Sequence, residues 1–165
     1  MLPQVVDGIE IALTSSFAVE ALRDHDVALA CDLYTDSFFE KSVAARFIAL
    51  VVALEVLKDK DLVSSEAIRL VDDWLGKLGK LGDEEAESFG SQLKHMKQLS
   101  IGRGIGRVVA RHLGKERARE AQKLYRIRSS FVHRGERPAD LRESLELTQL
   151  VVRELLIKIL QLGLR

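Results

Sequence analysis

The residue types best suited to chemistry lie together near position 130. The segment YRIRSSFVH spans residues 125–133, and in it Arg128 stands five positions before His133. A guanidinium can hold a phosphate through two parallel hydrogen bonds, and an imidazole can give or take a proton near neutral pH. Cleavage of RNA through its own 2′-hydroxyl needs a base, an acid and positive charge at the phosphate. This segment therefore holds residue types that can cleave RNA without a metal ion.

The neighbours of this pair have both a functional and a structural interpretation. Ser129 could bind a phosphate or orient His133, or it could be an ordinary residue on a helix surface. For Ser130 we favour the surface interpretation, and for Tyr125 a place in the core. For Arg128 and His133 we favour a functional role. On a regular helix a five-residue step turns about 140°, so we expect the helix to fray near His133.

Positive charge is concentrated in the same part of the chain, although the whole chain has a net charge of zero. Residues 1–93 hold 8 Lys or Arg against 18 Asp or Glu, and residues 94–137 hold 13 against 3. Such a basic segment could bind the phosphates of RNA, or it could lie against the acidic helices as a salt-bridged surface. The charge distribution alone does not decide between these two alternatives. The candidate RNA-binding residues are Arg103, Arg107, Arg111, Arg126 and Arg134.

Helices must position these side chains, because no convincing strand pattern follows residue 14 and no proline lies between Pro3 and Pro138. We expect an all-α bundle of five to seven helices that forms one domain over residues 1–165. Residues 43–57 are apolar almost all round, as in a helix at the centre of a bundle. The other predicted helices cover about residues 17–34, 64–79, 83–99, 105–113, 115–135 and 138–165.

Capping residues and inward positions are predicted for several of these helices. Ser64 or Ser65 can begin one helix and Asp83 the next, and Gly79 with Gly82 can close the first of these two. Gly135 can end the helix that carries the Arg128 segment. The candidate inward residues are Val19, Leu22, Leu29 and Leu33 in the first helix, and Ile68, Val71, Leu75 and Leu78 after Ser65.

Three segments of the chain resemble the HEPN superfamily, in particular its Apea-like branch. LYRIRSSFVH at 124–133 is similar to the Arg-x-x-x-x-His signature helix of that branch. FIALVVALEVL at 47–57 resembles an earlier helix of the branch that ends in Ala-Leu-Glu, and IGRGIGRVVARHLG at 101–114 resembles its middle segment. The resemblance covers roughly residues 38–162, with the segments in the family's order. Arg134 stands between His133 and Gly135, where the branch usually has glycine directly after histidine.

The resemblance implies an all-helical, HEPN-like domain that commonly dimerises and acts as a metal-independent endoribonuclease. Arg128 and His133 would be its catalytic pair. Members act in toxin, antiviral or RNA-processing settings, so RNA and a protein antitoxin or other neutralising partner are implied. Glu55, which matches the Ala-Leu-Glu, would orient Arg128, unless it pairs with Lys58 one turn later. A homodimer is expected because one chain offers one such histidine, whereas the reaction needs both a base and an acid.

Two rival hypotheses compete with catalysis. The first is a non-catalytic helical module that binds RNA, a nucleotide or a protein partner, since some members of the superfamily only bind. The second is a purely structural dimerising domain. A catalytic site requires Arg128 and His133 to be exposed in one concave cleft, whereas burial of both would favour the structural hypothesis.

Several other classes of site are disfavoured. Gly102, Gly104 and Gly106 have the wrong spacing for a dinucleotide-binding turn, and we expect them to let the start of a helix pack closely. The histidines lack an i, i+4 histidine partner, so neither a metal nor a cofactor is expected. Cys31 is the only cysteine, which excludes an intrachain disulfide and fits a reducing, cytoplasmic setting. The longest apolar run, residues 47–54, is far shorter than the roughly 20 residues that cross a bilayer, so no membrane association is expected.

Overall fold

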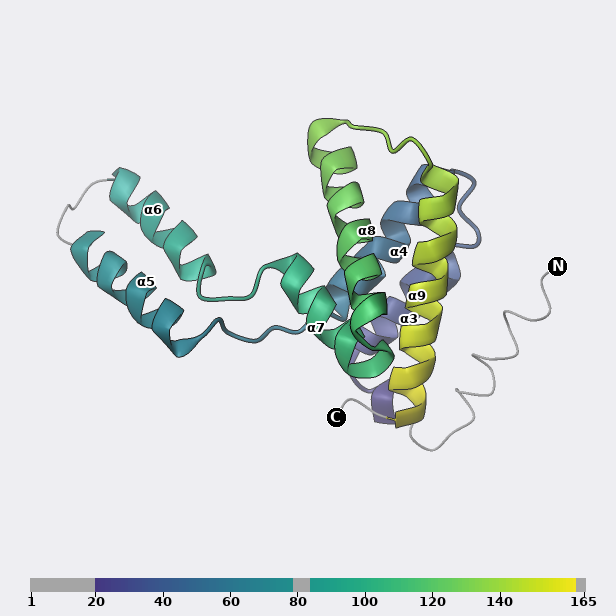
Figure 1. The fold of residues 1–165 in the computed structure, drawn as a ribbon, viewed down its shortest axis with the longest axis horizontal. Coiled ribbons are helices and arrows are strands. Elements are labelled where there is room, and N and C mark those ends of the chain that lie inside the picture. Colours follow the sequence, from purple (N-terminus) through teal and green to yellow (C-terminus); the bar gives the residue numbers. More distant parts are fainter. Residues whose placement is uncertain (1–19, 79–83, 163–165) are drawn as a thin grey trace.

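The computed structural model describes residues 20–78 and 84–162, and these fold almost entirely into α-helices (Figure 1). Within those ranges the only β-type pairing is one isolated antiparallel bridge between Leu62 and Gln98. The prediction of an all-α fold is therefore confirmed for the described part of the chain. Its helices are α3 (His25–Asp36), α4 (Val43–Val56), α5 (Ser65–Leu78), α6 (Glu84–His95), α7 (Ile101–Leu113), α8 (Lys115–Arg134) and α9 (Leu141–Leu162).

Helix α4 lies at the centre of the bundle, as its apolar sequence predicts. It contacts α3, α7, α8 and α9. Phe47, Leu50 and Leu54 are fully buried in it. Burial of one such side chain contributes about 1.5–3 kcal/mol, so this helix supplies a large part of the hydrophobic stabilisation. Its far end carries Glu55, which places that carboxylate at the edge of the core instead of on open surface.

Local capping explains where several helices begin and end. Asp140 accepts a hydrogen bond from the backbone N–H of Glu143 (3.0 Å) and starts α9, while Ser64 accepts one from Ala67 (3.3 Å) and starts α5. Gly135 adopts a left-handed conformation (φ 68°) directly after α8. The predicted ends of these helices at Ser64, Gly135 and residues 138–140 are confirmed. The predicted caps Gly79, Gly82 and Asp83, and the inward residue Val19, lie outside the described residues.

Three predicted helix boundaries are wrong. Helix α3 begins at His25, because the Asp24 carboxylate accepts a hydrogen bond from Asp26 N–H (2.8 Å) and caps it there. The helix predicted over residues 17–34 is therefore interrupted at residues 22–24. Its inward face is formed by Val27, Ala30 and Tyr34, whereas Leu29, predicted to point inward, is exposed. Helix α6 ends at His95 and not near residue 99, and α7 begins at Ile101 and not at residue 105. At Asp24 and at His95 the apolar spacing continues past the residue at which the helix is bounded.

Helices α5 and α6 form a hairpin that projects from the bundle (Figure 1). Residues 57–64 lead out to the hairpin and residues 96–100 return from it. The two segments are joined by hydrogen bonds from Val63 N–H to the Lys97 carbonyl (2.9 Å) and from Leu99 N–H to the Asp61 carbonyl (3.1 Å). We call this pair of segments the neck. None of the described helices combines the length and the apolar character that a membrane span requires.

Candidate active site

The candidate site lies where the end of α4 meets the last third of α8. Arg128 of α8 places its Nη1 atom 3.2 Å from Oε1 of Glu55 on α4. Both side chains are mostly covered, with 18% of the arginine and 17% of the glutamate exposed. The two helices contact each other directly, so the fold of the core fixes this ion pair. Glu55 thus lies beside Arg128, where the family resemblance places it.

Lys58 forms no ion pair with the Glu55 carboxylate, although its positive charge acts on that group. Its Nζ donates a hydrogen bond to the main-chain carbonyl oxygen of Glu55 (3.1 Å), as a helix-end lysine often does. The Arg128 guanidinium still has donors to spare, because its Nε–H is buried and makes no hydrogen bond among the described residues. A guanidinium N–H donates hydrogen bonds to phosphate oxygens, although this Nε–H lies below the surface.

The electrostatics of the pair link it to two more residues. Burial raises the pKa of the Glu55 carboxyl, and the charges of Arg128, Lys58 and His133 oppose that rise without cancelling it. Burial, followed by the nearby Glu55 charge, also raises the pKa of the Tyr125 hydroxyl. Tyr125 is half-buried and packs against the core, which confirms the structural interpretation for this residue. Glu55, Arg128, His133 and Tyr125 therefore share one electrostatic neighbourhood.

His133 lies in the last turn of α8, and its side chain is exposed. The prediction that the helix frays at this point is wrong, because α8 continues to Arg134. The helix is closed by Gly135, whose N–H donates to the Ser130 carbonyl. On this regular helix the imidazole is turned about 140° from Arg128. A single chain therefore presents a covered arginine and an exposed histidine, not both residues exposed together in one cleft.

Comparison with protein-family models, with curated proteins and with solved structures finds no match to this chain. The resemblance to the HEPN superfamily therefore depends on the three sequence segments alone.

The five candidate RNA-binding arginines fall into two groups. Arg107 lies 3.2 Å from Asp61, and Arg111 makes two contacts with Asp59, the shorter of 2.7 Å. Both arginines therefore have the arrangement of the salt-bridged alternative. Arg134 is similarly engaged, with Glu136 (3.3 Å) and with the Ser130 hydroxyl. Arg103 and Arg126 are exposed and form no ion pair with any described residue.

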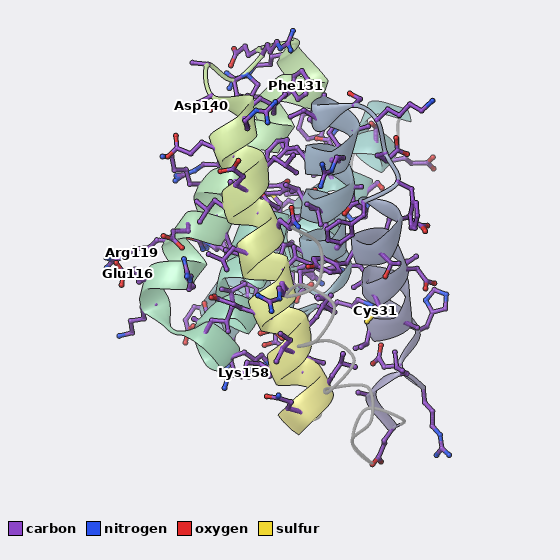
Figure 2. All side chains as sticks on the ribbon, turned by 90° about the vertical axis from the view of Figure 1, so that its right-hand side faces the viewer. Cys31, Glu116, Arg119, Phe131, Asp140 and Lys158 are labelled. Carbon is purple, nitrogen blue, oxygen red and sulfur yellow. The ribbon has the colours of Figure 1, made fainter. Side chains whose placement is uncertain are left out.

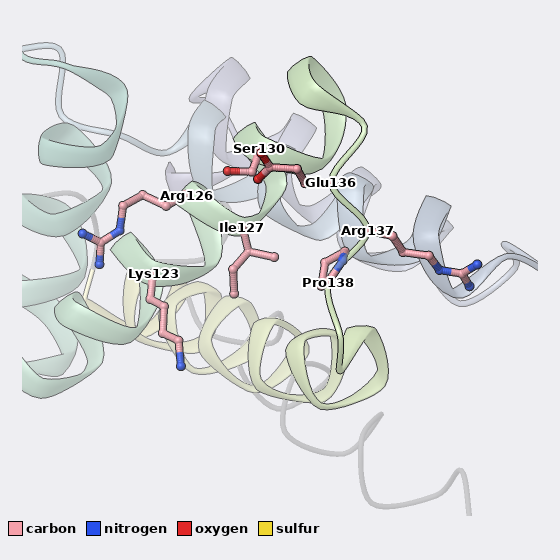
Figure 3. A pocket seen from close by; sticks show the side chains of 7 residues that line it. All are labelled: Lys123, Arg126, Ile127, Ser130, Glu136, Arg137 and Pro138. Carbon is pink, nitrogen blue, oxygen red and sulfur yellow. The ribbon is translucent and has the colours of Figure 1, made fainter.

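Arg126 stands at the rim of a hollow between the end of α8 and the loop to α9. The hollow has a volume of about 320 Å³ and is lined by Lys123, Ile127, Ser130 and residues 136–138 as well as Arg126. Figure 3 shows that the side chain of Arg126 extends to the left, that of Lys123 downward and that of Arg137 to the right. These three cations point in different directions, so they do not converge on a single site within the hollow. Ser130 bonds to Arg134 here, in agreement with a surface role, and Ser129 is half-buried.

The remaining polar candidates lie apart from this site. Burial raises the pKa of the Cys31 thiol on α3 (Figure 2) to about 11, so little of it is a reactive thiolate near neutral pH. Burial lowers the pKa of His112, and the neighbouring Arg111 charge lowers it further. Within residues 20–78 and 84–162, no three His, Cys, Asp or Glu side chains are grouped as metal ligands.

Sequence reasoning missed the acidic partners Asp59 and Asp61. Both follow α4 in the segment KDKD, residues 58–61, whose alternating charges were a usable signal. It also missed how close α7 and α8 approach. A Cβ atom added at Gly102 would lie 3.2 Å from the Tyr125 ring, so the first turn of α7 sits against the residue one turn before Arg128.

Proposed function

We propose that the protein is a metal-independent endoribonuclease of the HEPN type, with Arg128 and His133 in its active site. The observation that carries the proposal is the Glu55–Arg128 ion pair, followed five residues later on α8 by the exposed His133. These are the residues that the resemblance assigns to the site, and they come from helices far apart in the sequence. Glu55 holds the guanidinium in position, and 18% of the Arg128 side chain remains exposed for contact with a phosphate.

The chemistry follows from the residue types. A base removes the proton of the 2′-hydroxyl, and the 2′-oxygen attacks the phosphorus atom. The bond to the 5′-oxygen then breaks, and an acid gives that oxygen a proton. The products are a 2′,3′-cyclic phosphate and a 5′-hydroxyl. Histidine can serve as base or acid, and Arg128 would stabilise the charge that develops on the phosphate.

A twofold homodimer would complete this site. The reaction needs a base and an acid, and one chain supplies one histidine in the motif. Because α8 is regular to Arg134, the imidazole and the guanidinium of one chain point in different directions. A twofold axis near the end of α8 would bring two Arg128 and two His133 side chains around one cleft. A role in toxin or antiviral systems, with a protein antitoxin as partner, belongs to the same proposal.

A non-catalytic module is the second candidate, favoured by one observation. Arg128 is mostly covered and its charge is offset by Glu55, as in a purely structural ion pair. Such a protein would bind RNA or a partner through its exposed cations and would leave RNA intact.

Cleavage of mixed RNA in the presence of a chelator tests the proposal. His133→Ala should lower the cleavage rate by about 10²-fold or more, because it removes the proton-transfer group. Arg128→Ala should lose activity and also weaken RNA binding. Arg128→Lys should restore binding better than rate, since an ammonium cannot form the bidentate contact. Separate rate and binding measurements on each variant distinguish these effects.

Two control variants match the charge and residue type of those changes. His25→Ala removes an exposed histidine of α3, and Arg119→Ala removes an exposed arginine near the start of α8 (Figure 2). Both should cleave like the parent. If the His133 and Arg128 variants also cleave like the parent, the active site lies elsewhere. If the parent binds RNA and never cleaves it, the non-catalytic module is the correct function.

A further inference from the structure

A second cleft lies between the neck and the start of α7, next to the candidate site. It has a volume of about 800 Å³, within the range of roughly 300–1,000 Å³ that is typical of ligand pockets. Its lining includes Lys58, His95, Met96, Ile101 and Arg103. Among the described residues, no acidic side chain lines it. Such a lining favours an anionic ligand.

The cations of this cleft differ from the other cations around the neck. Lys60 pairs with Asp26 and Lys97 with Asp72, just as Arg107 and Arg111 pair with aspartates. Arg103 is exposed and forms no ion pair with a described residue. Among the described residues, the Lys58 ammonium donates only to the carbonyl oxygen of Glu55, so two further N–H donors remain. Positive charge that is neutralised elsewhere on this surface therefore remains available in the cleft.

The cleft also has an apolar side. Met96 is 54% exposed and Ile101 is 37% exposed, although both are apolar. A thioether packs favourably against an aromatic ring, and an isoleucine side chain can cover the other face of that ring. Gln98 and Ser100 line the same cleft and offer hydrogen bonds to the edge of a base. Phosphate-binding and base-binding groups thus occur within one cavity.

Two contacts link the lining of the cleft to the surroundings of the proposed active site. Lys58 follows Glu55 by three residues and binds its carbonyl oxygen. The first turn of α7 lies against Tyr125, one turn before Arg128. A strand whose phosphate reaches Arg128 could therefore place its next nucleotide in the cleft.

We infer that this cleft binds one nucleotide of single-stranded RNA next to the cleaved bond. Lys58 and Arg103 hold its phosphate, and its base lies against Met96 and Ile101. The ligand class rests on the proposed function, since an RNA substrate is what brings a nucleotide to this position. The cleft would then favour single-stranded RNA, because a paired base would first have to leave its stack, at a cost of a few kcal/mol.

The methionine content of the chain provides a specific probe. Met96 and Met1 are the only methionines, and Met1 lies outside the described residues. Protein labelled with ¹³C in the methionine methyl groups should give two signals, and Met96→Leu identifies the one from the cleft. A 2′-O-methyl tetranucleotide, which cannot be cleaved through its 2′-oxygen, should shift the Met96 signal in a saturable way.

Substitution of the cations tests how the phosphate is held. Lys58→Ala with Arg103→Ala should raise the Kd of the tetranucleotide by about 10-fold or more, since both cations that hold the phosphate are removed. The matched control Lys115→Ala with Arg119→Ala removes two exposed cations of α8 outside the cleft and should change the Kd by less than about 2-fold. Circular dichroism checks that each double variant is folded. The single variant Arg103→Glu provides the same test if the double variant does not fold.

The outcomes separate this inference from the proposed function. A saturable Met96 shift that depends on Arg103 supports the cleft even if the protein never cleaves RNA, in which case only the nuclease proposal fails. Bound RNA that leaves the Met96 signal unchanged overturns the cleft even if cleavage occurs. An equal or larger shift with oligoglutamate would show that the cleft recognises acidic peptides, and this too overturns the inference.

Discussion

Glu55 and Arg128 show how one ion pair can serve the site at some cost to stability. Each side chain is more than four-fifths covered, so water compensates neither charge fully. The raised pKa of Glu55 means that burial outweighs the attraction of the neighbouring cations. A carboxylate held in this way stabilises the position of Arg128 more than it stabilises the fold. This balance between orientation and stability is typical of functional sites.

The pH dependence of stability tests this interpretation. Because the pKa of Glu55 is raised in the folded protein, the folded state binds the proton more readily than the unfolded state. Glu55 therefore contributes most favourably at low pH, and this contribution is lost as pH rises from the usual value of 4.5 through the folded pKa. Glu55→Gln should remove this pH-dependent change, because the amide side chain does not titrate. Urea unfolding of both proteins at several pH values measures it. Parallel stability curves for parent and variant would contradict the prediction.

At the scale of elements, the contact between α7 and its surroundings depends on glycine. Gly104 and Gly106 are buried, as expected for glycines that let the start of a helix pack closely. A Cβ atom added at Gly104 would lie 2.6 Å from the main-chain oxygen of Asp59, which belongs to the neck. One added at Gly106 would meet the far end of the Gln122 side chain instead. The first clash is with rigid backbone and the second with a flexible group.

The two glycines form a matched pair for mutation. Gly104→Ala should destabilise the fold by about 2 kcal/mol or more, because the neck and α7 must move apart. Gly106→Ala should cost much less, since Gln122 can rotate away and alanine is better than glycine in a helix by about 1 kcal/mol. Chemical denaturation of both variants compares the free energies of unfolding. Equal losses in the free energy of unfolding would mean that the backbone of the neck moves as easily as the Gln122 side chain, which would contradict the prediction.

At the scale of the whole molecule, the basic segment does not form a uniform phosphate-binding surface. Its arginines at 107 and 111 pair with aspartates that follow α4, whereas Arg103 and Arg126 form no ion pair with a described residue. We expect RNA affinity to fall steeply with salt, because binding to phosphates releases counterions. Arg103→Ala with Arg126→Ala should flatten the plot of log Kd against log salt by roughly 0.7 for each phosphate that is no longer bound. Arg107→Ala with Arg111→Ala should change this slope less. The opposite ranking would make the paired arginines the RNA-binding ones.

Assembly is the second property of the whole molecule. We expect a twofold dimer with residues 125–137 of both chains near the interface. Val132, which lies next to His133, is 47% exposed although it is apolar, as a residue buried in such an interface would be in a single chain. Light scattering at high micromolar concentration should give the mass of a dimer, and Val132→Glu should shift it toward the monomer. A parent protein that is monomeric under these conditions would contradict both the dimer and the two-histidine mechanism.

The sequence by itself determined the helical class, the central position of residues 43–57 and the ends of helices at Ser64, Gly135 and residues 138–140. These properties depend on short-range causes: apolar spacing, capping side chains and the left-handed conformation of glycine. At Asp24 the apolar spacing predicts a helix that continues, whereas the capping carboxylate begins a new one. The prediction of this boundary is wrong because apolar spacing contains no information about capping.

Only the tertiary structure decided which charges meet. Arg107 and Asp61 are 46 positions apart and Arg111 and Asp59 are 52 apart, and no local pattern relates such residues. The same holds for Glu55 and Arg128, which the sequence could connect only through a family resemblance. The packing of α4 against α8 fixes that pair, and the neck fixes which cations remain available in the cleft. Local sequence determines the elements, whereas long-range packing determines the electrostatic environment of each candidate residue.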